Sequence, residues 1–398
     1  MKKALATILA LVMAIGLCSV SWATGSTLPT AENGVIKLTE NVTLTERWEV
    51  AANTEITLDL NGYSITSAGQ VIMNNGKLTI TDNKGGGKIV STGSQAIGVG
   101  SNSVTNIQKA IVESVEGAVI TGRAIGAIIN IYDGTFSASD NAVIAGNGSD
   151  REGTGNTINI SGGVFNGKIT TPGYVACGIY APWKDNINVT GGTFNITGGA
   201  GIVARAGNVT VTNAVFNTTG NATGKVGDSR VVVPCSAIVF DSQANYPAMN
   251  NDSVIHVVSG KFNSEMNAVS MIKNDNETDR VAVTGGTFST DVKEYLAEGK
   301  ILQKNGDTYT AVTNSGITSG TYTAKPTVPD GYKVVENTDG TFTVEKVGGY
   351  YYYQPTTDTK TTDTKGSPKT FDAGIALYVG MALTSAAGVV FVGKKRED

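Results

Sequence analysis

The middle of the chain repeats one pattern of apolar and polar positions. Short segments with apolar residues at alternate positions run into a glycine or another turn residue and end on a phenylalanine. Alternation with a period of two is typical of β-strands that bury one face. The six phrases are NIYDGTF, NISGGVF, NVTGGTF, TVTNAVF, HVVSGKF and AVTGGTF, which end at Phe136, Phe165, Phe194, Phe216, Phe262 and Phe288.

The spacing of these phenylalanines indicates a repeat architecture. They recur after 29, 29, 22, 46 and 26 residues, and we interpret the interval of 46 as two periods. A second apolar phrase lies between them, so each period is predicted to hold two short strands. This second phrase is AIGV from Ala96, AVIA from Ala142, GIYA from Gly178, GIVA from Gly201, AIVF from Ala237 and AVSM from Ala268.

Short strands of this kind need neighbours, because one period alone cannot bury its apolar residues. Stacking the periods as successive coils buries them and pairs each strand with its equivalent in the next coil, ~4.8 Å away. The sequence therefore predicts an all-β fold, a parallel β-helix. In such a solenoid Phe136, Phe165, Phe194 and Phe216 stack in one internal file.

The pattern divides the chain into five segments. Residues 24–284 are predicted to form the β-helix with its N-terminal cap, and residues 285–347 a small β module that closes the solenoid with hairpins at Gly306-Asp307 and Asp339-Gly340. Residues 348–366 are rich in Thr, Asp and Lys and are predicted to be a disordered linker that spans the cell wall. The first and last segments, 1–23 and 367–398, have a different composition.

The N-terminal segment, residues 1–23, has the pattern of a cleaved secretory signal peptide. Lys2 and Lys3 precede an apolar stretch, and Ser21 and Ala23 place small residues at a cleavage site. At the other end, residues 373–393 are 21 residues without a charge, enough for a helix that crosses a bilayer. The basic tail Lys394, Lys395 and Arg396 is expected to stay cytoplasmic, so the rest of the chain is predicted to be extracellular.

The last segment resembles the cell-wall sorting signal of Gram-positive surface proteins. The shared features are a Pro-x-Thr pentapeptide, an apolar span and a short basic tail. The resemblance implies that a sortase recognises the motif, cleaves between Thr370 and Phe371, and attaches the protein to peptidoglycan. The membrane would then hold the chain only before processing. The motif consists of Ser367, Pro368, Lys369, Thr370 and Phe371, with Ser367 and Phe371 departing from the commonest form.

The solenoid region resembles the pectin-lyase-like right-handed β-helices found in large surface proteins of Gram-positive bacteria. The resemblance covers roughly residues 30–310 and is carried by LTENVTLTERWEVAANTEITLDLNGYSI, NGKLTITD and the repeated GGTF. It implies a right-handed coil. It also raises an enzyme alternative, because related β-helices include polysaccharide lyases and glycosidases.

The net charge, the single histidine and the positions of the two cysteines beyond the signal peptide argue against several classes of function. The net charge is −4 without a basic stripe, so nucleic acid is not an expected partner. The one histidine, His256, argues against a histidine-rich metal site and a Ser-His-Asp triad, and we expect no metal, cofactor or catalytic residue. Cys177 and Cys235 fall two coils apart, ~9.6 Å, beyond the ~7 Å limit for a disulfide. They are predicted to be buried free thiols.

Long charged turns precede the strand that leads into each Phe phrase, and stacking would bring them to one edge. Their carboxylates, among them Asp150, Asp185 and Asp241, support the enzyme alternative, because stacked coils would hold them at glycosidase-like separations. Aromatic and polar groups on the same edge favour recognition of a sugar or a protein surface. The candidate ligand-binding residues are Trp183, Lys184, Asp185, Arg205 and Tyr246.

Together these patterns favour a secreted, wall-attached surface protein that acts as an adhesin or as a binding module for glycans or host surface proteins, without catalysis of its own. A surface polysaccharide lyase or glycoside hydrolase on the same scaffold is the first alternative. A purely structural stalk is the second.

Overall fold

The computed structural model describes most of the predicted solenoid and the residues that follow it. The predicted signal peptide, the linker beyond Gly348 and the sorting segment lie outside the described residues, so those three assignments stay predictions. The described ranges are 27–122, 124–139, 141–146, 155–169, 171–227, 232–241, 253–273 and 280–348.

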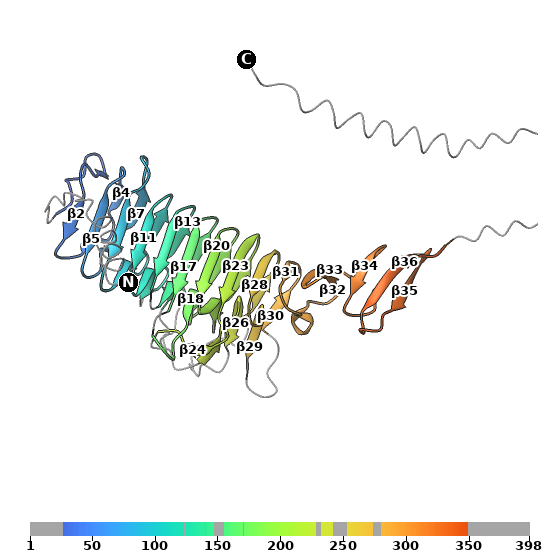
Figure 1. The fold of residues 1–398 in the computed structure, drawn as a ribbon. Coiled ribbons are helices and arrows are strands. Elements are labelled where there is room, and N and C mark those ends of the chain that lie inside the picture. Colours follow the sequence, from blue (N-terminus) through green and yellow to red (C-terminus); the bar gives the residue numbers. More distant parts are fainter. Residues whose placement is uncertain are drawn as a thin grey trace, which may run out of the picture. The chain divides into compact units, whose positions relative to one another are not determined.

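Three parallel sheets, here called A, B and C, form the solenoid (Figure 1). Sheet A consists of β1 (Val35–Lys37), β4 (Glu55–Asp59), β7 (Lys77–Thr81), β10 (Val104–Ile107), β13 (Ile128–Ile131), β16 (Thr157–Ile160), β19 (Asn186–Val189), β22 (Asn208–Val211), β27 (Ile255–Val257) and β30 (Val281–Val283). The parallel part of sheet B consists of β2 (Val42–Leu44), β5 (Ser64–Ser67), β8 (Lys88–Ser91), β11 (Ile111–Ser114), β14 (Thr135–Ala138), β17 (Val164–Lys168), β20 (Thr193–Thr197), β23 (Ala214–Thr219), β28 (Gly260–Ser264) and β31 (Thr287–Phe288). Sheet C consists of β3 (Trp48–Val50), β6 (Ile72–Asn74), β9 (Gln95–Val99), β12 (Gly117–Gly122), β15 (Ala142–Gly146), β18 (Ala176–Ala181), β21 (Gly199–Ala204), β26 (Ile238–Asp241) and β29 (Val269–Ile272).

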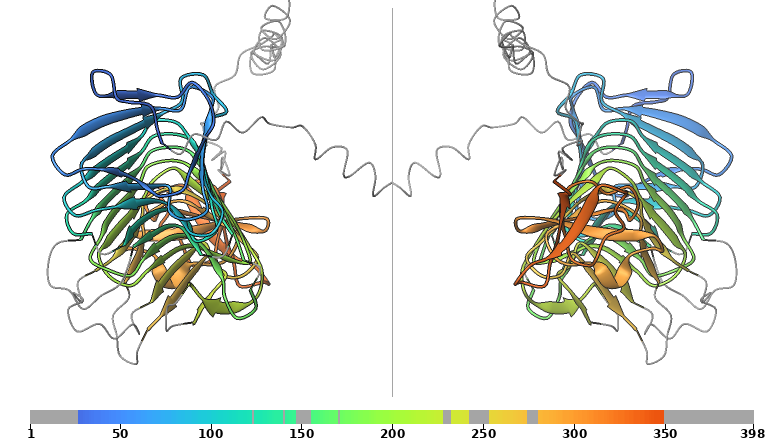
Figure 2. Two further views of the ribbon diagram at one scale, coloured as in Figure 1. Left: turned by 90° about the vertical axis from the view of Figure 1, so that its left-hand side faces the viewer. Right: turned by 90° about the vertical axis from the view of Figure 1, so that its right-hand side faces the viewer.

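The chain visits the sheets in the order A, B, C and then begins the next coil, for about nine turns among the described residues. Figure 2 shows the coils overlying one another. The all-β, right-handed type of parallel β-solenoid predicted from the sequence is confirmed. Each coil has three strands, however, and the prediction of two was wrong.

The difference arises within the Phe phrase, which contains a turn. In the phrase that ends at Phe194, β19 ends at Val189 and β20 begins at Thr193, so the chain leaves sheet A and enters sheet B within a few residues. Gly192 has φ +96°, a conformation that L side chains rarely adopt, and a Cβ there would lie 3.2 Å from the carbonyl oxygen of Gly163. The glycine therefore marks a corner between two strands.

The internal file of phenylalanines is present as predicted. Consecutive rings are nearly parallel, with interplanar angles of 9–11°, and their centroids lie 4.4–5.5 Å apart. All the rings are fully buried. The file continues beyond Phe216 and consists of Phe136, Phe165, Phe194, Phe216, Phe262 and Phe288.

The interval of 46 residues is one coil, so its interpretation as two periods was wrong. Phe216 and Phe262 are direct register partners on β23 and β28, and their ring centroids lie 5.5 Å apart. Before β26, the additional residues include the antiparallel hairpin of β24 (Thr223–Lys225) and β25 (Val232–Pro234). After β26, residues 242–252 lie outside the described residues.

Rows of asparagine side chains run along the outer faces of sheets A and B. In each row the side-chain NH2 of one asparagine donates to the side-chain oxygen of the asparagine in the preceding coil, at 2.8–3.2 Å. Stacked amides satisfy one another in this way in any in-register parallel sheet. The rows are Asn106, Asn130, Asn159 and Asn188 on sheet A, and Asn166, Asn195, Asn217 and Asn263 on sheet B.

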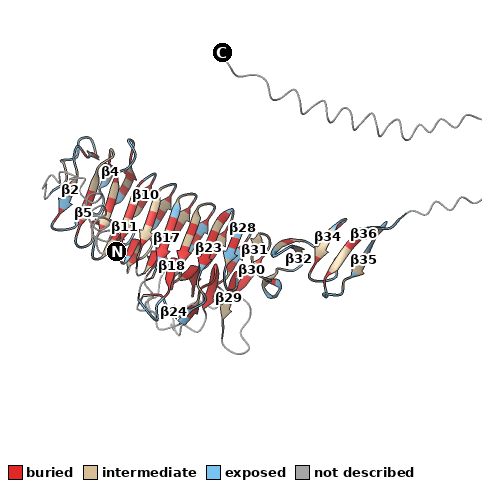
Figure 3. Ribbon diagram, viewed as in Figure 1, coloured by how far each residue is buried: buried red, intermediate tan, exposed pale blue. Residues whose placement is uncertain are grey.

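The main core fills the space between the three sheets, and along many strands of sheets A and B buried residues alternate with more exposed ones (Figure 3). Beyond β31 the pairing becomes antiparallel, as β31 pairs with β33 and not with another coil. This last part has a small core of its own around Ile301, Ile317, Tyr322 and Val344. Its elements are η1 (Lys293–Tyr295), β32 (Lys300–Asn305), β33 (Thr308–Thr313), β34 (Gly320–Tyr322), β35 (Tyr332–Glu336) and β36 (Phe342–Lys346).

Truncating a ring inside the phenylalanine file should cost more than truncating the ring at its end. Phe194→Ala removes two stacked contacts and leaves an internal cavity, so we expect the free energy of unfolding to fall by ~3–5 kcal/mol. Phe288→Ala removes one stacked contact and should cost less. Chemical denaturation followed by circular dichroism measures both, and equal losses would contradict an energetic role for the file.

Candidate functional site

The turns from sheet C to sheet A lie above one another, because the strands on both sides of them are in register. Ala181 of β18 pairs with Ala204 of β21, which pairs with Phe240 of β26. The shared edge predicted from the sequence is therefore present among the described residues. Asp150, one of the carboxylates predicted to lie along it, falls outside the described residues.

A buried ion pair sits at this edge. Nε of Arg205 lies 2.8 Å from Oδ2 of Asp241, and the two side chains are 1% and 0% exposed. Nη1 of Arg205 donates a hydrogen bond of 2.9 Å to the hydroxyl of Tyr180. The three residues belong to consecutive coils, so the guanidinium links the ends of β18, β21 and β26.

A second buried carboxyl group, Asp185, links the turn that follows β18 to the turn that follows β15 in the preceding coil. Its Oδ1 accepts hydrogen bonds from the backbone N–H of Asn156, at 2.8 Å, and from the side-chain NH2, at 3.1 Å. Burial raises the pKa of Asp185, and the hydrogen bonds from Asn156 offset only part of that rise. Asn156 in turn accepts from the backbone N–H of Ala127 at 3.0 Å, so Asn156 and Asp185 hold three successive turns in place.

These contacts are those of a structural network, whereas the sequence assigned the same residues to ligand binding. Trp183, Asp185 and Arg205 are 3%, 1% and 5% exposed, which leaves little of each side chain for a ligand to contact. Lys184 is half-buried, and Tyr246 lies outside the described residues. The ligand-binding role stays a prediction for all five residues. Exposure could not be inferred from residue type, because it depends on what packs over the edge.

Sheet C carries an apolar stripe on its outer face. One register position of successive strands forms it, and in the later coils the stripe residues belong to a second hydrophobic cluster on the outer side of sheet C. Val226 and Val233, from the β24–β25 hairpin and its flank, belong to this cluster together with Val203 and Val239. Along the coils the stripe consists of Met73, Gly98, Ile120, Ala145, Tyr180, Val203 and Val239, and in the coil before Met73 the same register position holds Glu49.

The two cysteines belong to the cluster beneath the hairpin. Cys177 and Cys235 are buried and free, as predicted. Burial raises the pKa of both thiols, because a thiolate would lose its hydration there. Both thiols therefore act as small apolar side chains.

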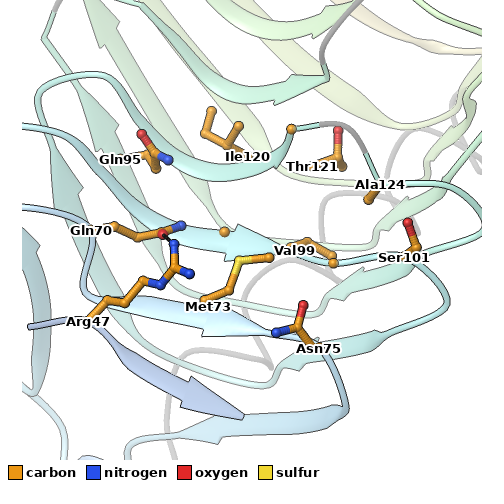
Figure 4. A pocket seen from close by; sticks show the side chains of 13 residues that line it. Arg47, Gln70, Met73, Asn75, Gln95, Val99, Ser101, Ile120, Thr121 and Ala124 are labelled. Carbon is orange, nitrogen blue, oxygen red and sulfur yellow. Dashed lines mark hydrogen bonds between the residues drawn. The ribbon is translucent and has the colours of Figure 1, made fainter. Parts of the chain in front are cut away.

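In the first coils, Met73 and Ile120 of the stripe form part of the apolar floor of a hollow of about 390 Å³ (Figure 4). Gly98 has no side chain between Met73 of the preceding coil and Ile120 of the next, and the side chain of Gln70 lies in that position. A Cβ at Gly98 would overlap the side-chain NH2 of Gln70, which lies above it. Here a single coil lacks the side chain that its neighbours carry.

Polar groups surround this floor. Nη1 of Arg47 donates to Oε1 of Gln70 at 3.2 Å, and the Ser94 hydroxyl donates to Oε1 of Gln95 at 2.8 Å. The NH2 groups of both glutamines make no hydrogen bond to the described part of the chain, and neither does Oδ1 of Asn75. Donors and acceptors with spare capacity over an apolar floor suit a small hydroxylated ligand.

Sequence reasoning missed this hollow, although its signal is present. In the second apolar phrase the position of Gly98 is occupied elsewhere by Ala145, Tyr180, Val203 and Val239. Gly98 is part of that phrase, but which side chains lie around it depends on how the strands stack in register.

Two further observations concern the described residues only. They contain no group of three or more His, Cys, Asp or Glu side chains arranged to hold a metal ion. In the same ranges, no helix has the length and apolar character needed to span a bilayer.

Comparison of the chain with protein-family models, with curated proteins and with solved structures found no match.

The Arg205–Asp241 pair gives a test of the structural role of the edge. Arg205→Met leaves a buried carboxylate without its cation, so we expect the free energy of unfolding to fall by ~3–5 kcal/mol. The double variant Arg205→Met with Asp241→Leu should recover part of that loss. Urea denaturation measures both, and a single variant as stable as the wild type would contradict the structural role.

Proposed function

We propose that the protein is an extracellular surface protein, attached to the cell wall, that binds glycans through the hollow on sheet C. One observation carries the binding part of this proposal: Gln70, Gln95 and Asn75 line the hollow, and each has one amide group that makes no hydrogen bond to the described residues, beside an apolar floor that includes Met73 and Ile120. Pockets that combine an apolar surface with a few convergent polar groups are the usual form of small-ligand sites. A sugar ring offers the matching chemistry, with C–H groups on its faces and hydroxyl groups around its rim.

The scaffold supports the same function. Its coils are held together by backbone pairing and by the internal file of phenylalanines, so the outer faces are free to vary. The hollow lies on strands, which hold its side chains more rigidly than loops would. Location at the cell surface rests on the sequence alone, through the secretory pattern of residues 1–23 and the sorting motif from Ser367 to Phe371.

Filling the hollow should abolish glycan binding without unfolding the protein. Gly98→Leu places a side chain where only Gln70 and Met73, both flexible, must move. We expect the wild type to bind a subset of a glycan array and the variant to lose at least about tenfold in affinity for that subset, equivalent to ~1.4 kcal/mol.

The matched control is Gly348→Leu, because no atom lies within 4 Å of a Cβ at that exposed glycine. It should bind like the wild type. Equal binding by the Gly98→Leu variant would remove the hollow from the site. New reducing ends or unsaturated products on incubation with the bound glycan would instead favour the lyase or hydrolase alternative.

Anchoring can be tested separately from binding. Thr370→Ala removes the residue whose carbonyl would be transferred to peptidoglycan, so the protein should move from the wall fraction to the membrane and the medium. Thr364→Ala, in the predicted linker, is the control and should leave the distribution unchanged. Immunoblots of fractionated cells measure the result, and an undiminished wall fraction for the Thr370 variant would contradict the sorting motif.

A further inference from the structure

Sheet B carries a second hollow, of about 460 Å³, on its outer face. It crosses four consecutive strands, β11, β14, β17 and β20, which run parallel and in register. The hollow on sheet C lies on another face of the solenoid and shares no lining residue with this one. The two can therefore be tested independently.

The hollow on sheet B lies where one coil carries short side chains between coils that carry longer ones. Glu113, Ser137 and Asn166 are register partners that occupy one outward position on successive coils. Two residues further along the strands, Ser139 and Lys168 share the outer face, because side chains alternate with a period of two. The coil that contains β14 thus contributes two short serine side chains, whereas β11 and β17 on either side carry longer ones. The hollow lies above the two serines.

The polar groups in the gap are not used within the protein. The side chains of Ser137, Ser139 and Thr197 make no hydrogen bond to the described residues. Asn166 accepts from Asn195 through Oδ1, at 3.2 Å, and its NH2 group has no acceptor in the described ranges. Hydroxyl and amide donors are therefore available on three neighbouring coils.

The charges around the hollow do not cancel. Glu113 is paired with Lys88, whose Nζ lies 3.0 Å from its Oε1. Lys168 is exposed and has no carboxylate within ion-pair distance among the described residues. One cation therefore faces a set of neutral donors, a combination that suits an anionic group attached to a hydroxylated molecule.

From this arrangement we infer that the hollow on sheet B binds a carboxylate-bearing sugar, such as a sialic or uronic acid. Lys168 contacts the carboxylate, while Asn166, Ser137 and Ser139 bind the hydroxyl groups. This site is separate from the hollow on sheet C and does not rest on the function proposed for it.

The test compares probes that differ in one carboxylate. Calorimetry on the full-length protein measures 3′-sialyllactose against lactose, and galacturonate oligomers against their methyl esters. We expect saturable binding of at least one acidic probe, weaker binding of its neutral counterpart, and a loss of affinity as salt is raised to ~0.5 M, because the contact with Lys168 is exposed. If neither acidic probe binds saturably, or if the neutral probes bind equally well, the inference is wrong.

Two substitutions locate the site. Lys168→Met should weaken binding of the acidic probe by about three- to tenfold, whereas Lys261→Met, also exposed on sheet B but outside the hollow, should leave it unchanged. Ser137→Leu fills the hollow while keeping Lys168, and should reduce binding as well. Unchanged binding by the Lys168 and Ser137 variants would overturn the assignment, and Gly98→Leu should have no effect on this probe.

Discussion

In-register pairing of each strand with its equivalent in the next coil is the constraint on which the rest of the structure depends. It fixes the distance between coils, and it places every side chain above its counterpart. Equivalent positions then become files: phenylalanine inside, asparagine outside, and an apolar stripe on sheet C. Each file runs through several coils, so a residue in a file contacts residues of the same kind in the coils before and after it. The stability of one coil therefore depends on the adjacent coils.

Much of the architecture could be predicted from periodicity. The file of phenylalanines followed from the spacing of Phe136, Phe165 and Phe194, since equal intervals place equal residues at one position. The number of strands per coil could not be derived in this way, because the corner at Gly192 lies inside a phrase that reads as continuous alternation. The interval between Phe216 and Phe262 was misread for a similar reason: length alone does not distinguish two coils from one coil that carries an insertion.

The site was harder to predict than the fold. Trp183, Asp185 and Arg205 are residue types that often contact ligands, but here all three are buried, and Asp185 and Arg205 belong to polar contacts that link consecutive turns. The hollow on sheet B arises from the opposite feature, which is the absence of bulk at Ser137. Small residues attract little attention in a sequence, and their effect depends on the side chains in the coils before and after. The asparagine rows could have been found, because Asn166, Asn195, Asn217 and Asn263 each follow a phenylalanine of the file.

The β24–β25 hairpin indicates how a coil of this solenoid can accept an insertion during evolution. The hairpin lies between β23 and β26 in the sequence, yet Phe216 of β23 still pairs directly with Phe262 of β28. Lengthening a loop adds little to the entropy of closing it. Evolution can therefore exchange, enlarge or delete the excursion of one coil while its neighbours keep their pairing, so new surfaces can be acquired one coil at a time.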